Sequence, residues 1–199
     1  MDTRALKYPG GYDPKSQSVV CLFAAQLDDQ LKLLKDATKD LTVEQLEWQL
    51  RPGMNTIGML LTHLAVVEIF WIVVAAQEIP AEPEGDEINL KIIGIRMDDD
   101  GLPCKPADLH PATLKGKTIA DYFAMLDKAR ASVHSELGKW KDAELEGTFV
   151  RKRGTQERKI TRMWTLYHVL EHFAGHFGQI LLVKHMMRDA GLLPPEQSR

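Results

Sequence analysis

Cysteine is scarce in this sequence, and its scarcity excludes the class of small disulfide-stapled proteins. The chain has 199 residues and two cysteines, Cys21 and Cys104, which form no C-x-x-C pair. A reducing cytoplasm is therefore the expected location. The N-terminus lacks the apolar core of a signal peptide. The longest apolar stretch, around residues 69–76, is too short to span a bilayer, so we expect no membrane partner.

A strong charge of either sign is also missing. The net charge is −3, with 44% hydrophobic and 27% charged residues, as in ordinary soluble globular proteins. Nothing in this balance favours nucleic acid as a partner. One basic cluster stands out, which we interpret first as a solvated hairpin tip and alternatively as an anion clamp near a site. It consists of Arg151, Lys152, Arg153, Arg158 and Lys159.

Internal repeats and low-complexity segments are absent, and helical periodicity dominates instead. A chain of this length is expected to form a single domain over residues 1–199. The spacing of apolar residues predicts four long helices. They cover residues 16–38, 56–77, 119–138 and 162–190. The second is apolar on most faces and should lie at the centre of the fold.

The segments between these helices contain turn-forming residues. Residues 80–117 are rich in proline, glycine and aspartate. They predict either a long crossover between the second and third long helices or an insertion over one end of the bundle. The acidic run at residues 98–100 lacks the spacing of a calcium loop and predicts a solvated turn. Residues 147–160 predict a small hairpin with its turn at Gly154. Thr42 and Gln45 have the outline of a capping box, which predicts a further short helix.

Histidine is concentrated in one place. Of the seven histidines, His168, His172 and His176 stand at successive four-residue intervals in the last long helix. Residues four apart share one helix face, so two neutral imidazoles there could grip one metal ion. The full ladder rises about 12 Å, too far for one ion with bonds of about 2.1 Å. The chelating pair is therefore His168 with His172 or His172 with His176. The alternative is a set of packed, hydrogen-bonded core histidines.

A third metal ligand is expected from another helix. His63 lies among aliphatic residues in the second long helix, where a lone imidazole would be hard to satisfy. Either Glu171 or Gln179 could orient a ligand ring or line the pocket. No general base is assigned. The remaining histidines, which we expect at the surface, are His110, His134 and His185.

The candidate histidines lie in two motifs. The first is W-x-x-x-P followed by Asn55-Thr-Ile-Gly-Met-Leu-Leu-Thr-His63-Leu. The second is His168-Val-Leu-Glu-His172-Phe-Ala-Gly-His176-Phe-Gly-Gln179. Together they resemble the motifs of the DinB/YfiT-like superfamily, and of its mini-DinB branch in particular. The resemblance covers residues 16–191. Where this chain has Phe177, the family often has a basic residue.

The resemblance implies an all-α four-helix bundle in up-down-down-up order, with a long crossover and often a homodimer. It also implies a metal centre formed by His63, His172 and His176, with His168 in an accessory position. Nickel or zinc is the usual ion. Family members with known activity include thiol-dependent transferases and maleylpyruvate isomerases, which use a low-molecular-weight thiol bound near the metal.

The leading functional hypothesis is a metal-dependent enzyme acting on a small-molecule substrate. Thiol-dependent S-transfer is preferred to hydrolysis by the resemblance alone. The alternative is a non-catalytic helical protein that binds a small ligand and carries a structural metal. An open coordination position favours the enzyme, whereas a fourth protein ligand without solvent access favours the alternative. Nucleic-acid contact through the basic cluster is a weaker third hypothesis.

Overall fold

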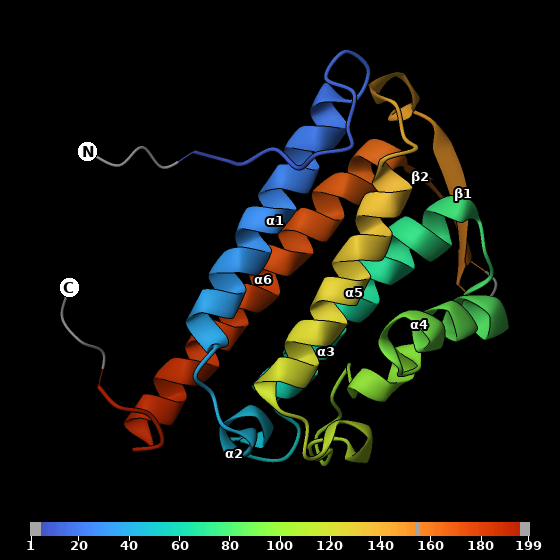
Figure 1. Cartoon of the computed structure of the whole chain (residues 1–199). Helices are drawn as coiled ribbons and strands as arrows, with labels where there is room; N and C mark the ends of the chain where they lie inside the picture. The colour runs from blue at the N-terminus through green and yellow to red at the C-terminus, as the bar shows by residue number, and fades with distance from the viewer. Residues whose placement is uncertain (1–4, 154–155, 196–199) are drawn as a thin grey trace.

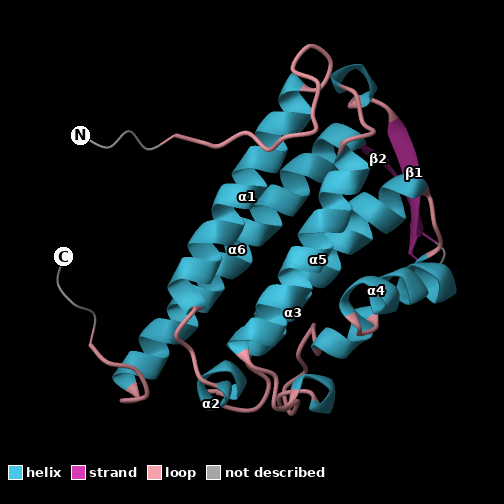
Figure 2. Ribbon diagram, viewed as in Figure 1, coloured by secondary structure: helices cyan, strands magenta, loops and turns pink. Residues whose placement is uncertain are grey.

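The structure is mostly helical, with one small two-stranded sheet (Figures 1 and 2). It is a computed structural model, and it describes residues 5–153 and 156–195. The α-helices are α1 (Ser18–Thr38), α2 (Val43–Glu47), α3 (Ile57–Glu68), α4 (Asp86–Ile93), α5 (Ile119–Leu137) and α6 (Arg162–Asp189). The strands are β1 (Thr148–Arg153) and β2 (Gln156–Thr161). Short helical turns are η1 (Ile69–Val74), η2 (Ala75–Gln77), η3 (Ala81–Gly85), η4 (Met97–Asp100), η5 (Ala112–Leu114) and η6 (Asp142–Glu144).

The four long helices α1, α3, α5 and α6 pack side by side (Figure 1). The predicted helical segments are confirmed, with ends that differ by one or two residues. The second predicted segment is α3 continued by η1 and η2, because the backbone loosens into a π-helical turn at Ile69–Val74. Such turns are frequent at functional sites. This one carries Phe70 and Trp71.

Helix α3 and its continuation form the centre of the core. Ile57–Gln77 spans 21 residues with a mean hydropathy of 2.2, so it is long and apolar enough to cross a membrane. The expectation that no segment has this length is therefore wrong. However, 78% of the most apolar window is buried inside the protein, and this burial accounts for its composition. Leu60, Leu61 and Leu64 are among its fully buried side chains.

Threonine side chains cap four of the helices. Thr42 and Gln45 form the predicted capping box at α2, and Thr118 forms another with Asp121 at α5. Thr56 and Thr161 accept backbone N–H bonds at the starts of α3 and α6. A cap of this kind satisfies one of the unpaired donors at a helix start. The N-terminal signals in the sequence therefore locate the helix boundaries.

The crossover has more structure than the sequence indicates. Residues 86–93 form α4, which packs against α5 and η1. Gly94, with φ of 82°, ends this helix in the left-handed conformation that glycine adopts without strain. Ile93 and Ile95 are buried and fix the crossover to the core.

The predicted hairpin is present as the antiparallel pair β1–β2. Phe149 pairs with Ile160, and both are buried against the core. Arg151 pairs with Arg158 in the next register position on the same face. The turn predicted at Gly154 lies outside the described residues, as do the side chains of Lys152 and Arg153.

A buried ionic network joins three of the long helices. Arg130 of α5 donates two hydrogen bonds to Glu68 of α3, at 3.0 and 2.6 Å, and one to Asp28 of α1 at 2.9 Å. His134 donates from Nε2 to Asp28 at 3.0 Å, and its Nδ1 bonds the Tyr12 hydroxyl at 2.9 Å. The expectation that His134 is a surface residue is therefore wrong. Long-range partners from α1 and the N-terminal segment bury it partly.

Candidate metal centre

Three histidines from two helices converge at one point. His63 comes from the middle of α3, and His172 and His176 come from successive turns of α6. The ring centroid of His63 lies 5.0 Å from that of each of the other two, which are 4.3 Å apart. One potential ligand atom from each residue lies within 4.8 Å of the other two. The packing of α3 on α6 thus brings together the residues that the two motifs named.

Hydrogen bonds orient two of the three rings. His63 Nδ1 lies 2.7 Å from Asp100 Oδ2, and His176 Nδ1 lies 2.8 Å from Gln179 Oε1. A carboxylate only accepts, so His63 Nδ1–H donates, which leaves Nε2 as the nitrogen available to a metal ion. Bonds of this kind fix the tautomer and direction of metal-binding imidazoles. Gln179 therefore has the orienting contact that the sequence left open between it and Glu171.

The role of Asp100 corrects the expectation of a solvated acidic turn. The residue is 1% exposed, and its other oxygen accepts a bond from the Leu102 backbone. Asp98, two residues earlier, is exposed as expected. Asp100 is the carboxylate at the C-terminal end of η4, and no sequence pattern distinguishes it from the other acidic residues of the run. The contact with His63 bridges 37 positions of the chain and depends on the folded crossover.

The two α6 rings at this point are held neutral. Burial, with the neighbouring imidazoles of His176, His63 and His168, lowers the pKa of His172 from 6.5 to about 3. Burial likewise lowers the pKa of His176, against an opposing hydrogen bond from Gln179. At neutral pH these nitrogens are therefore electron-pair donors rather than cations. Neutral imidazole is the form that binds metal ions.

The donor set fits a divalent metal ion. His172 Nε2 and His176 Nε2 lie 3.0 Å apart. Two ligand nitrogens on a tetrahedral ion with bonds of 2.0–2.1 Å would be separated by roughly 3.3 Å. The His63 side chain is 21% exposed, so solvent reaches the group. Three protein ligands with solvent access are typical of an open, catalytic site rather than a closed structural one.

His168 belongs to an aromatic cluster beside the three histidines. Its ring stacks on Trp164 at 4.6 Å and 12°, and meets the edge of Trp71 at 5.0 Å. Its centroid is 5.8 Å from that of His172, compared with 4.3 Å between His172 and His176. Of the two chelating pairs open on sequence alone, the geometry thus favours His172 with His176. Glu171 is exposed and lies 3.5 Å from His168 Nδ1.

His110 and His185 were also expected at the surface, and the structure tests both expectations. His110 is half-buried and bonds Thr56 Oγ1 at 2.9 Å through Nδ1, so its assignment to the surface is wrong. Burial lowers its pKa. This bond joins the crossover, to which His110 belongs, to the N-cap residue of α3. His185 is exposed, as expected.

Comparison with known proteins now places the chain in a family. The sequence profile described as "DinB superfamily" matches residues 26–180. The chain belongs to the DinB superfamily. Comparison with curated proteins gives no significant match.

Two solved structures match this DinB-superfamily chain. A conserved protein from Enterococcus faecalis matches with a TM-score of 0.60 at 18% identity, over 83% of this chain and 94% of its own. A DinB-like protein from Bacillus cereus matches with a TM-score of 0.46 at 20% identity, over 87% and 96%. The first likeness, at this identity, shows a shared fold alone.

Beside the histidines, the DinB-superfamily fold leaves a cavity of about 450 Å³. It begins at His63 and Asp100 and extends along Val67 and Phe70 to Arg151 of the hairpin. The hairpin therefore lies at the edge of the site, a location that the sequence did not give. Of the basic cluster, Arg151 points inward, whereas Arg158 and Lys159 are exposed.

Proposed function

We propose that this DinB-superfamily protein is a metal-dependent enzyme acting on a small molecule. The observation that carries the proposal is the convergence of three imidazoles, two of them with lowered pKa, at one partly exposed point. His63, His172 and His176 would hold the ion. A divalent ion bound there supplies Lewis-acid chemistry that lowers the pKa of a thiol or of water.

The surrounding residues support this role. Asp100 and Gln179 hold the Nδ1 atoms of His63 and His176, so that their Nε2 atoms face a common point. The buried carboxylate of Asp100 also supplies negative charge close to a site whose proposed ligands are all imidazoles. Trp71, Trp164 and His168 form an aromatic cluster beside His172.

We further propose thiol-dependent S-transfer as the reaction, with hydrolysis as the alternative. Nickel or zinc is the proposed ion, and a low-molecular-weight thiol the proposed second cofactor. These assignments rest on family resemblance. So do the up-down-down-up order of a four-helix bundle and the homodimer. The proposed cytoplasmic location rests on the scarcity of cysteine.

The test is a spectroscopic titration of protein that was produced without a histidine tag and loaded with cobalt. Addition of a small thiol such as 2-mercaptoethanol should change the visible spectrum of the wild type and of His168→Ala. His172→Ala should give no site spectrum. A wild-type spectrum that is indifferent to thiol and to hydroxide, at full occupancy, would overturn the enzyme proposal. It would favour a ligand-binding protein with a structural metal.

A further inference from the structure

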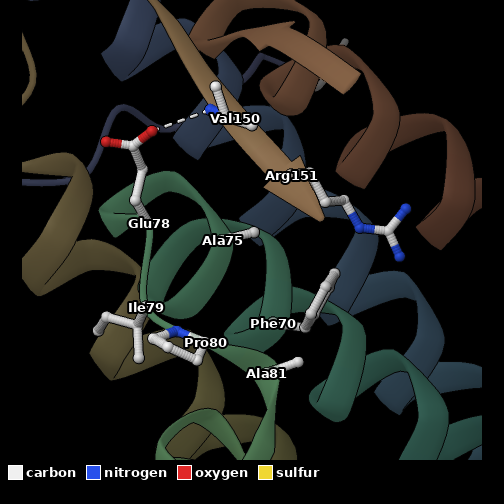
Figure 3. Close-up of a pocket in the computed structure, with 8 residues that line it drawn as sticks. All are labelled: Phe70, Ala75, Glu78, Ile79, Pro80, Ala81, Val150 and Arg151. Carbon is white, nitrogen blue, oxygen red and sulfur yellow. Dashed lines mark hydrogen bonds between the residues drawn. The ribbon is translucent and has the colours of Figure 1, made fainter. Parts of the chain in front are cut away.

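The cavity at His63 continues into a second one. A cavity of about 440 Å³ adjoins it and shares Phe70, Ala81 and Arg151 as lining residues. Figure 3 shows this second cavity between the end of the long central helix and strand β1. The two cavities meet at these three residues, and we refer to the pair as the groove; His63 lines its near end.

The far end of the groove is apolar. Ala75, Ile79, Pro80 and Val150 line it. Glu78 is the acidic residue of this lining, and its carboxylate accepts the Val150 backbone N–H at 3.0 Å, pointing away from Arg151 (Figure 3). This end therefore suits a hydrocarbon or aromatic group, which gains about 25 cal/mol per Å² of apolar surface removed from water.

Arg151 supplies positive charge at the junction of the two cavities. Its guanidinium lies 5.2 Å from the Phe70 centroid and 4.8 Å from that of Trp71. Stacking of this kind holds the planar group in place, where it can offer a fork of donors to a carboxylate. Directly paired residues in an antiparallel ribbon point to the same face, so Arg158 stands beside it.

Three acidic residues of the first cavity have partners of their own. Asp86 bonds Arg96 and the Met97 backbone, and Asp99 bonds the Arg96 backbone. Asp100 is committed to His63 and Leu102. Glu82 and Asp98 are exposed at the rim. The carboxylates deepest in the cavity thus have partners within the crossover itself.

We propose that the groove binds a small organic acid with an apolar body. Its carboxylate would bind Arg151, its apolar part would fill the space around Ile79 and Pro80, and its other end would face His63. This assignment names the substrate class of the proposed enzyme and in that respect rests on the proposed function. Binding itself needs Arg151 and the apolar pocket, and it does not need the metal.

Calorimetric titration with 4-phenylbutyrate and its neutral isostere 4-phenylbutanamide tests the proposal on the full metal-loaded chain. The acid should bind at least about 10-fold more tightly than the amide, because a charge-assisted bond is worth about 1.5–3 kcal/mol. Arg151→Met should remove that preference. Lys159→Met is the matched control, since Lys159 is a cation of the same hairpin outside both cavity linings, and it should bind like the wild type.

Two further variants keep the test decisive. Ala81→Phe, at an exposed position that lines both cavities, should weaken binding of acid and amide alike, and it leaves Arg151 in place. His172→Asn, which removes a proposed metal ligand, should bind the acid within about threefold of the wild type. Loss of binding in His172→Asn with retention in Arg151→Met would mean that the acid binds the metal, and would overturn the proposal. So would equal affinity for acid and amide, or no binding of either. Failure of the metal chemistry alone would leave these affinities unchanged.

Discussion

At the residue scale, the hydrogen bond between His63 and Asp100 orients one of the three proposed metal ligands. A buried carboxylate at 2.7 Å from Nδ1 fixes the tautomer of His63 and directs Nε2 toward His172 and His176. It also makes the ring a stronger donor to a cation. Gln179 likewise orients the ring of His176 through a hydrogen bond to Nδ1, but its amide carries no charge.

The first prediction concerns Asp100. Asp100→Asn keeps the size of the side chain but removes its charge, and should weaken zinc affinity by about 10–100-fold. Competition with a chromophoric chelator measures the affinity. Asp98→Asn, an exposed neighbour in the same turn, should bind like the wild type. Wild-type affinity in Asp100→Asn would mean that the carboxylate is only structural.

The second prediction follows from the lowered pKa of His172. Unfolded, this imidazole takes up a proton near pH 6.5, and folded it does so only at about 3. The metal-free unfolded state therefore binds more protons between these values, so the free energy of unfolding should fall as pH falls from 6.5 toward 3. Above pH 6.5 the contribution should be constant.

Denaturant unfolding of metal-free wild type and His172→Gln, at several pH values, isolates this effect. The stability advantage of the wild type over the variant should shrink, or reverse, as the pH falls from 7 to 4.5. A difference that stays constant over that interval would contradict the burial of a neutral ring. Titrating groups away from this histidine cluster contribute equally to both proteins.

At the element scale, the long helices were predictable because their apolar residues recur with helical period and their ends carry threonine caps. Helix α4 was missed because it is short and lies between proline- and glycine-rich segments. Isolated helices of that length are marginal, and packing against α5 and η1 stabilises this one. The π-helical turn at η1 also has no sequence pattern of its own.

The third prediction concerns the ionic network that joins α1, α3 and α5. Glu68 and Arg130 are both buried, at 2% and 5% exposure. Glu68→Gln would leave the Arg130 guanidinium with one charged partner fewer in a dry environment. The variant should lose about 3–5 kcal/mol of stability, measured by urea unfolding. Asp127→Asn is the control, because its ion pair with Lys35 is at the surface, and it should cost about 1 kcal/mol or less.

At the scale of the whole molecule, the sequence named the three histidines because each motif is local and carries its own spacing. The residues that surround these histidines could not be predicted from the sequence. Asp100, His110 and His134 gain their partners from segments 37, 54 and 106 positions away, and only the fold brings these together. The location of Arg151 at the groove depends in the same way on the docking of the hairpin.

The fourth prediction links the site to global stability. A ligand that binds only the folded state stabilises it by about 2.7 kcal/mol at a concentration of 100 times its Kd. Zinc at that excess should raise the Tm of wild type and His168→Ala in thermal unfolding, and a chelator should reverse the rise. His63→Ala and His172→Ala should show no such rise, since they lack a proposed ligand. Equal stabilisation of all four proteins would indicate binding elsewhere.

The most direct measurement is anomalous diffraction at the metal edge from crystals of untagged protein grown with zinc. The account predicts one strong peak per chain, with nitrogen atoms of His63, His172 and His176 at about 2.0–2.1 Å. His168 should remain stacked on Trp164. A peak held by His168 with His172, or no peak among the three histidines at saturating zinc, would contradict it.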